Sequence, residues 1–217
     1  MRKKNVRKEG FAALHNTHPG WVKQPDHLEL LFPAQQPYVL ELGCGKGYFT
    51  VQHAALHPEW NHFGVDIKAD RLYMGAQEAL DQSLANVRFV QTDVELFVHN
   101  FPAGSCARIW VTFPDPYPAE SYAKRRLTHR RFLETYRNLL LPGGQLHFKT
   151  DNPSLFQWSE NEFGLLPGVR FLHRSEDVHA TPGLPFEVYL LTAYEQRWHR
   201  EGRKTLYLAV DFPNGTC

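Results

Sequence analysis

The chain has 217 residues, of which 42% are hydrophobic and 22% are charged, a balance typical of a globular protein with a buried core. Its three cysteines, Cys44, Cys106 and Cys217, form no CxxC pair, which argues against a disulfide framework or a structural zinc site. The net charge of +1 gives by itself no evidence for a nucleic-acid partner. The cysteine usage fits the reducing cytoplasm, which is the expected location. We expect neither a secretory signal nor a membrane span, because no apolar run is long enough.

From Tyr38 onward, short apolar runs alternate with longer segments of helical period. The expected strands are Tyr38 to Leu42, His62 to Asp66, Val87 to Gln91, Arg108 to Thr112, Gln145 to Lys149, Val169 to His173 and Thr205 to Val210. The expected helices are Tyr48 to Leu56, Ala69 to Ser83, His129 to Leu141, Ser154 to Phe163 and Tyr189 to Arg200. This alternation predicts an α/β fold with a mostly parallel, seven-stranded sheet and helices on both faces.

No linker or composition shift divides the chain after its first part. Residues 36–217 are therefore expected to form a single domain. A basic arm, residues 1–35, precedes it, and one interpretation is that this arm is mobile. Two long irregular stretches, Phe113 to Thr128 and Ser175 to Phe186, interrupt the expected domain. Loops of this length in a compact domain are often functional.

The segment Leu40 to Gly47 reads LELGCGKG and places an apolar strand directly before three glycines and a helix. Glycine lets the backbone come close to a ligand where a side chain would block it, so this turn predicts a nucleotide-type pocket. A dinucleotide fingerprint requires a third glycine at the position that Tyr48 occupies here. A nicotinamide cofactor is therefore the weaker interpretation.

Two further acidic residues follow the next two expected strands. Asp66 ends the second strand, 19 residues after Gly47, where a carboxylate can accept hydrogen bonds from both ribose hydroxyls of an adenosine; Asp93 follows the third. The alternative is that both residues simply cap the helices that follow.

The arrangement of Glu41, Gly43, Gly45 and Gly47 resembles the first motif of the class I methyltransferases, which have a Rossmann-like fold.

That resemblance implies S-adenosyl-L-methionine as the cofactor, bound by Glu41, Gly43, Gly45, Gly47, Asp66, Asp93 and Asp115, with Asp93 near the adenine. Cys44 is expected to be a small buried filler, because nothing nearby in the sequence would activate it.

Three later segments form a second group. The fourth strand runs into Phe113 to Pro118, whose three prolines restrict the backbone around Asp115 and Tyr117. Lys149 to Asn152 ends the fifth strand, and Thr192 to Arg197 opens the last expected helix. Over residues 38–212 the order of these motifs resembles the bacterial tRNA (guanine-N7)-methyltransferase family, which has a Phe-Pro-Asp-Pro-Trp loop, a Lys-x-Thr-Asp strand end and a Thr-x-Tyr/Phe-Glu helix start.

The resemblance implies transfer of a methyl group to N7 of a guanine in the variable loop of tRNA. Asp115 is the expected catalytic residue, and the expected substrate-binding residues are Tyr117, Lys124, Arg125, Arg126, Asp151, Thr192, Tyr194 and Glu195. The chain departs from the family where Tyr117 replaces a tryptophan, Ala119 a usual lysine and Ala193 a commonly charged residue. These departures concern the RNA contacts and leave the cofactor motif unchanged.

Guanine N7 carries a lone pair that is unprotonated at neutral pH, so the reaction needs alignment more than a base. A carboxylate beside the purine stabilises the positive charge that the transfer creates, which favours Asp115 for this role. The alternatives are a turn-forming role for Asp115, a helix cap for Asp151 and a solvated helix face for Glu195.

The basic run from Lys124 to Arg131 follows the acceptor loop directly, which favours phosphate neutralisation beside the chemistry. Arg126 and Arg130 share a helix face if the helix begins early enough, and the N-terminal Arg2 to Lys8 cluster is either a second clamp or a solubilising tail.

Two other functions stay open: a methyltransferase acting on an exocyclic amine, and a non-catalytic tRNA-binding protein. The histidines show no HxH or HExxH pair, so no metal is expected. A monomer is slightly favoured.

Overall fold

The computed structural model describes residues 3–17, 31–32, 34–192, 194–199 and 201–212. Arg2, Ala193 and Cys217 lie outside these residues. The described chain divides into two compact units, and the single domain that the sequence predicts for residues 36–217 stays a prediction. Residues 1–100 and 190–193 form the first unit, and residues 101–189 and 194–217 form the second.

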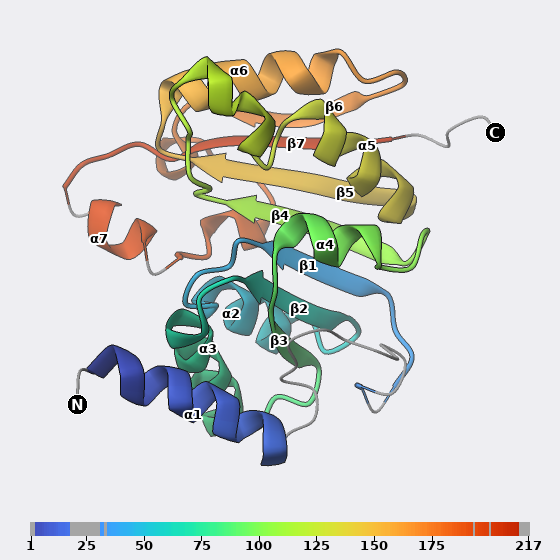
Figure 1. The fold of residues 1–217 in the computed structure, drawn as a ribbon. Coiled ribbons are helices and arrows are strands. Elements are labelled where there is room, and N and C mark those ends of the chain that lie inside the picture. The colour runs from blue at the N-terminus through green and yellow to red at the C-terminus, as the bar shows by residue number, and fades with distance from the viewer. Residues whose placement is uncertain (1–2, 18–30, 33, 193, 200, 213–217) are drawn as a thin grey trace. The chain divides into compact units, whose positions relative to one another are not determined.

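In the described part of the first unit there are three strands and four helices; Figure 1 labels them. They are α1 (Lys3–Thr17), β1 (Tyr38–Leu42), α2 (Tyr48–Leu56), β2 (Asn61–Asp66), α3 (Ala69–Asp81), β3 (Val87–Gln91) and α4 (Val94–His99). β1 pairs with β2, and β2 with β3, both in parallel register. All residues of β1 and β2 are buried, as expected for strands of a parallel sheet that is covered by other elements.

Among the residues that the structure describes in the second unit, four strands are joined by helices and 3₁₀ turns. Its elements are β4 (Cys106–Thr112), η2 (Glu120–Arg125), α5 (Arg130–Leu139), β5 (Leu140–Thr150), α6 (Pro153–Gly164), β6 (Arg170–Ser175), η3 (Val178–Ala180), η4 (Phe186–Tyr189), α7 (Glu195–His199) and β7 (Leu206–Asp211). β4 and β5 are parallel, whereas β7 pairs antiparallel with both β5 and β6.

The seven strands follow the order β3-β2-β1-β4-β5-β7-β6, which confirms the predicted α/β fold with a mostly parallel sheet of seven strands. The pairing data add that β7 is reversed, a feature that hydrophobic patterning alone does not specify. That helices cover both faces of the sheet stays a prediction.

Within the basic arm that the sequence predicts, Lys3–Thr17 form a helix, and mobility of the arm stays a prediction. α1 runs beside α3 in Figure 1, and Phe11 belongs to the same apolar cluster as Leu72 and Ala76 of α3. Gly10 lets the two helices approach, since a Cβ at this position would lie 2.6 Å from the Tyr73 ring. Lys3, Lys4 and Lys8 stay exposed. The role of this basic surface as a clamp for RNA stays a prediction.

The expected helix from Tyr189 to Arg200 is wrong over its first half. α7 begins only at Glu195, and the preceding η4 ends at Tyr189. Between them, the carbonyl of Leu191 accepts a hydrogen bond of 3.1 Å from the Gln52 side chain of α2, so a tertiary contact replaces a helical one.

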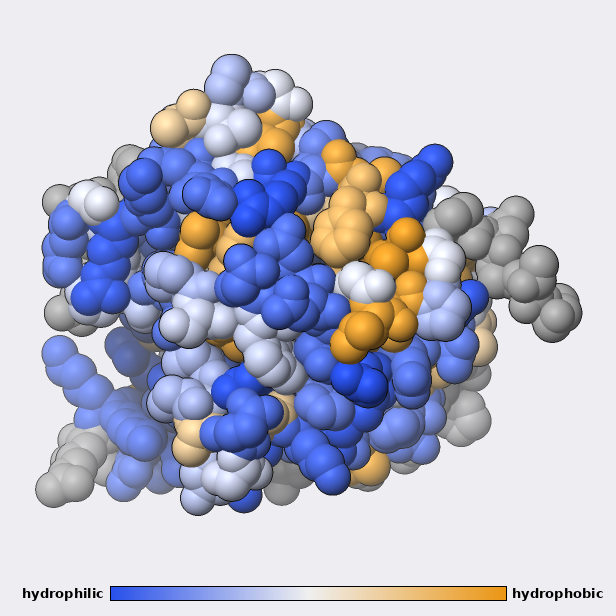
Figure 2. Space-filling model, turned by 90° about the horizontal axis from the view of Figure 1, so that it is seen from above, coloured by the Kyte–Doolittle hydropathy of each residue, from blue (hydrophilic) through white to orange (hydrophobic). Residues whose placement is uncertain are grey.

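The surface seen in Figure 2 carries patches of apolar side chains between hydrophilic ones. Within the second unit, exposed Leu165 and Phe171 line a shallow groove of about 510 Å³ beside α6 and β6. No residue of the predicted site lines this groove. Among the described residues, none of the helices has the length and apolar character that a bilayer crossing requires.

Candidate active site

The turn between β1 and α2 in the first unit has the backbone that its glycines predict. Gly43, Gly45 and Gly47 have φ angles of 77°, 57° and 68°, in the left-handed region that costs a residue with a side chain on the order of 1–2 kcal/mol. The turn is also attached to β2, because the amides of Gly43 and Cys44 donate to the carbonyl of Val65 at 2.9 and 3.0 Å. The alternation of glycine in the sequence is therefore a backbone requirement.

Glu41 shapes this turn from within the first unit. Its buried carboxylate accepts hydrogen bonds from the backbone amide of Thr50, at 3.0 Å, and from the Thr50 hydroxyl. Thr50 lies in the first turn of α2, whose N-cap position is Gly47 and has no side chain to offer. Glu41 thus supplies the capping carboxylate that the sequence next to the helix lacks. Its contact with a cofactor stays a prediction.

The turn is closely packed at one glycine and open at another. A Cβ on Gly47 would lie 2.2 Å from the Phe89 ring of β3, whereas a Cβ on Gly45 would meet no atom within 4 Å. The backbone at Gly45 is therefore accessible to a ligand, as a nucleotide-type pocket requires. Cys44 is buried among apolar residues, and this burial raises the pKa of its thiol, which agrees with the expected filler role.

Asp66 ends β2 and holds the same turn. One of its carboxylate oxygens accepts from the amide of Gly45 at 3.0 Å, and the other accepts from the amide of Lys68 at 2.8 Å. Burial raises the pKa of this carboxyl, against the lowering effect of these two amides. Because a carboxylate oxygen can accept two hydrogen bonds, each oxygen of Asp66 retains capacity for a ribose hydroxyl. These residues fit an adenosine-containing cofactor.

Asp93 is the N-cap of α4, as the alternative interpretation predicts. Its Oδ1 accepts from the amides of Glu95 and Leu96 at 2.8 and 3.4 Å. The residue is exposed, and its contact with an adenine stays a prediction.

The acceptor loop of the second unit, residues 113–118, follows β4 and is strained at two positions. Phe113 and Tyr117 have φ angles of 48° and 42°, which is uncommon for residues other than glycine. The amide of Phe113 donates to the carbonyl of Lys149 at 2.8 Å, which fixes the start of the loop to β5. Asp115, at the centre of the loop, is exposed. The loop therefore presents a carboxylate on a restrained backbone.

Asp151 lies beside an aromatic group at the end of β5. Its Oδ2 accepts from the Tyr194 hydroxyl and from an Arg203 guanidinium nitrogen, each at 3.2 Å. The Tyr194 ring lies 5.3 Å from the Phe113 ring of the acceptor loop, measured between centroids. The capping role considered for Asp151 is wrong, because Asn152 caps α6 by accepting from the Leu155 amide at 2.8 Å.

Glu195 is not on a solvated helix face, since it is only 2% exposed. Its Oε2 lies 2.7 Å from Nζ of Lys149, which is fully buried, and its Oε1 accepts from the Thr205 hydroxyl at 2.9 Å. Lys149 also donates to the carbonyl of Val188 at 2.9 Å. The sequence motifs predict no separate role for Lys149. The place of Lys149 inside the expected strand Gln145 to Lys149 is the available signal, because a lysine buried in a strand needs a carboxylate partner.

The basic run after the loop divides into exposed and buried members. Lys124 and Arg125, in η2, are exposed, and the Arg125 guanidinium lies 4.7 Å from the Tyr122 ring centroid. Arg126 is instead 6% exposed and bonded to loop carbonyls. The shared helix face considered for Arg126 and Arg130 is wrong, because α5 begins only at Arg130.

Thr192 belongs to the first unit, where it is buried.

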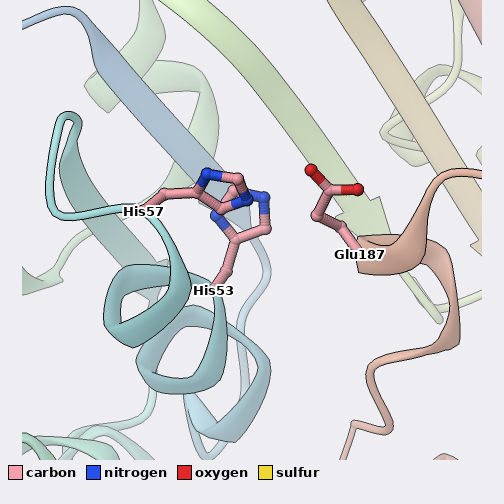
Figure 3. A group of neighbouring side chains, drawn as sticks. All are labelled: His53, His57 and Glu187. Carbon is pink, nitrogen blue, oxygen red and sulfur yellow. The ribbon is translucent and has the colours of Figure 1, made fainter.

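A histidine cluster lies in the first unit, on α2 and β2. His53 and His57 have ring centroids 4.7 Å apart, and both appear in Figure 3 with Glu187, a residue of the second unit. His62 has Nδ1 3.1 Å from the Trp60 carbonyl and Nε2 2.9 Å from Nδ1 of His53. A carbonyl only accepts, so Nδ1 of His62 carries the proton and Nε2 accepts from His53. Burial lowers the pKa of His62 to about 3. The expected absence of a metal stays a prediction.

Comparison with known proteins gives the family. A family model described as "Putative methyltransferase" matches residues 35–208. The tRNA (guanine-N(7)-)-methyltransferase of Porphyromonas gingivalis is 35% identical over 208 residues, covering 95% of this chain and 84% of the relative. The proteins of the same name from Christiangramia forsetii and Brevibacillus brevis are 38% and 34% identical, covering 83% and 94% of this chain and 80% and 95% of their own lengths. The chain belongs to the tRNA (guanine-N7)-methyltransferase family.

Solved structures agree with this family at the level of the fold. The 16S rRNA methyltransferase KamB aligns with a TM-score of 0.62 at 16% identity, over 88% of this chain and 95% of its own. TrmN from Thermus thermophilus aligns with a TM-score of 0.57 at 20% identity, over 97% of this chain and 51% of its own. The solved structures thus confirm the Rossmann-like methyltransferase fold, and the family model and the named relatives confirm the family, as the sequence motifs predict.

Proposed function

We propose that this chain transfers the methyl group of S-adenosyl-L-methionine to N7 of a guanine in tRNA, by family resemblance in the variable loop. The observation that carries the proposal is the identity of 34–38%, over most of the chain, with relatives that bear the name of this activity. The site supports the proposal because one unit holds a glycine turn with an adjoining carboxylate, and the other holds a restrained acceptor loop. The proposed setting is the cytoplasm.

The first unit would hold the cofactor. The open backbone at Gly45 and the two oxygens of Asp66 suit the methionine and ribose parts, Gly43 and Gly47 set the shape of the turn, and Asp93 would face the adenine. Glu41 would act through the cap on α2, which fixes the turn. When bound, S-adenosyl-L-methionine supplies an electrophilic methyl group on a positively charged sulfur.

The second unit would hold the guanine. N7 attacks with a lone pair that needs no deprotonation, so the protein has to orient the base and not to remove a proton. Positive charge moves to the purine during transfer, and the Asp115 carboxylate would stabilise it while accepting from the base edge. The strained backbone keeps this carboxylate in a restricted set of positions before substrate arrives.

Aromatic and basic side chains around Asp115 would recognise the RNA. Tyr194 is exposed and Tyr117 is partly exposed, and both rings can stack on an unpaired base. Asp151 and Glu195 would orient these groups from the end of β5 and from α7. A substrate contact of Thr192 stays a proposal by family resemblance. Lys124 and Arg125 are exposed cations that would neutralise backbone phosphates.

The test is incubation of the purified protein with radiolabelled S-adenosyl-L-methionine and an unmodified tRNA transcript, followed by digestion and identification of the labelled nucleoside. The expected product is 7-methylguanosine. Label in a base methylated on an exocyclic amine would show that this amine, and not N7 of guanine, accepts the methyl group. Cofactor and tRNA binding without label would instead indicate a non-catalytic tRNA-binding protein.

A further inference from the structure

Arg126 has contacts unlike those of a phosphate-binding arginine. Its Nη2 donates to the carbonyl of Tyr117 at 2.9 Å, and its Nε lies 3.2 Å from the carbonyls of both Pro116 and Tyr117. The side chain is 7% exposed, so its guanidinium faces the protein and not the solvent. Arginine offers several donors in one rigid plane, and here they are directed at two consecutive carbonyls of the acceptor loop.

The same guanidinium is held on its other side by α6. Its central carbon lies 4.3 Å from the Trp158 ring centroid, a distance at which a cation and an aromatic face attract each other. Two further contacts fasten the segment after Arg126 to this helix: the hydroxyls of Thr128 and Ser159 are 2.7 Å apart, and Arg130 bonds Glu162 through its amide at 2.8 Å. α6 is therefore the support from which Arg126 reaches the loop.

The loop needs such support because its conformation is unfavourable for its own residues. Tyr117 has a φ angle of 42° and Phe113 one of 48°, and positive φ values persist in residues other than glycine only where the surroundings enforce them. The two bonded carbonyls belong to Pro116 and Tyr117, the residues directly after Asp115. A change at Arg126 therefore alters where the Asp115 carboxylate lies.

We propose that Arg126 is a positioning residue: it clamps the acceptor loop through the carbonyls of Pro116 and Tyr117, and it binds no phosphate. This role replaces the substrate contact that the sequence predicts for Arg126. The expected effect of Arg126 on kcat rests on the proposed function. Arg125, the adjacent residue, is exposed and remains a proposed phosphate contact. The two neighbouring arginines thus have different tasks.

The test compares Arg126→Lys with Arg125→Lys, since both keep the charge and only the first loses a buried planar donor set. With saturating cofactor, Arg126→Lys is expected to lower kcat about 10- to 100-fold, because a displacement of about 1 Å at a reacting group can cost this much. Its KM for tRNA should change less than about twofold. Arg125→Lys should chiefly raise KM, and the salt dependence of KM should fall or stay the same, since a lost phosphate contact releases fewer counterions. A raised KM with unchanged kcat in Arg126→Lys would overturn the proposal.

Amide hydrogen exchange provides a second readout that does not depend on activity. Exchange in the peptide that covers residues 113–122 is expected to rise about tenfold or more in Arg126→Lys and to stay at the wild-type level in Arg125→Lys. Unchanged exchange in Arg126→Lys would overturn the clamp. If the wild type yields no 7-methylguanosine, the proposed function is wrong. The amide exchange of the loop in Arg126→Lys then still tests whether Arg126 clamps the loop.

If Arg126→Lys fails to bind S-adenosyl-L-methionine and so has not folded, Trp158→Leu replaces it. This variant keeps Arg126 and removes only its stacking partner. The same rise in loop exchange is expected, by a smaller factor, and its absence would count against the proposal.

Discussion

The glycine turn of the first unit and the acceptor loop of the second are both restrained, but by different means. The turn takes positive φ values at glycines and is closed by Glu41 and Thr50, nine residues apart. The acceptor loop takes positive φ values at Phe113 and Tyr117 and depends on Arg126, which in turn rests on Trp158. The first conformation uses glycines, which accept positive φ values at little cost, whereas the second is imposed on residues that disfavour it by contacts from Arg126 and Trp158.

The largest expected effect separates the chemistry of the two regions. Asp115→Ala should lower kcat about 10³-fold, the effect of losing one preorganised charge-stabilising group, while the Kd for S-adenosyl-L-methionine stays within about twofold. Asp66→Ala is the matched variant in the first unit and should raise that Kd at least about tenfold. Single-turnover kinetics and calorimetric titration measure the two quantities. Equal loss of both in Asp115→Ala would mean that Asp115 is structural.

A second prediction concerns the packing of the glycine turn. Gly47→Ala adds a Cβ 2.2 Å from the Phe89 ring at a φ of 68°, so strain and overpacking together should lower the free energy of unfolding by about 3 kcal/mol. Gly104→Ala is the control, because its φ of 59° is similar and no atom lies within 4 Å of the added Cβ. Its expected cost is about 1 kcal/mol. Urea unfolding of both variants measures the difference, and equal costs would contradict the packing argument.

A third prediction compares two ion pairs of the second unit with the same separation. Lys149–Glu195 and Arg174–Glu160 each have a nitrogen and an oxygen 2.7 Å apart, but only the first pair is buried. Glu195→Gln leaves a buried ammonium without its counter-charge and should lower the free energy of unfolding by about 3 kcal/mol. Glu160→Gln should cost less than about 1 kcal/mol.

Replacing both partners separates stability from recognition. Lys149→Met combined with Glu195→Gln should regain most of the stability that Glu195→Gln loses, because no unpaired charge remains. Transfer should stay impaired in this double variant if Glu195 orients the guanine. Full recovery of both properties would restrict Glu195 to a structural role.

The smallest expected effect is a pH dependence carried by the first unit. His62 has a pKa of about 3 in the folded chain, because burial disfavours its charged form, against about 6.5 when unfolded. The unfolded chain therefore binds the proton more readily, so stability is lost as the pH falls below 6.5. Between pH 7 and pH 5 this loss amounts to about 2 kcal/mol.

Urea unfolding at the two pH values tests this effect in the wild type and in His62→Gln, whose loss should be smaller by that amount. A residual loss is expected from His147 of the second unit, whose pKa burial also lowers. An identical pH dependence in both proteins would contradict the assignment to His62.

The sequence predicts best where a local pattern decides the structure. β1, β3 and α2 have the predicted bounds, and α3 differs only at its end. Helical period and the glycine spacing carry this information over a few residues. The six-residue α4 and the short η2 were missed because they span too little sequence to show a period.

Contacts between distant residues account for the rest. The carbonyl of Leu191 bonds the Gln52 side chain where the sequence predicts the last helix. Arg126 is buried, although the sequence suggests that the whole basic run is exposed. Neither the Lys149–Glu195 pair nor the stacking of Arg126 on Trp158 follows from spacing, since the partners are 46 and 32 residues apart. The site motifs could thus be found in the sequence, but not the contacts that hold them.

The position of β7 determines when the second unit can form during synthesis. β7 follows every other strand along the chain, yet it lies between β5 and β6 and supplies the pairing partner of each. A ribosome adds about 5–20 residues per second, so β5 spends several seconds with one edge open before Leu206–Asp211 emerge. Most of the first unit, residues 1–100, has left the ribosome long before. The nascent chain thus exposes an unpaired strand edge that other chains can bind, and this interval is when a chaperone has most to protect.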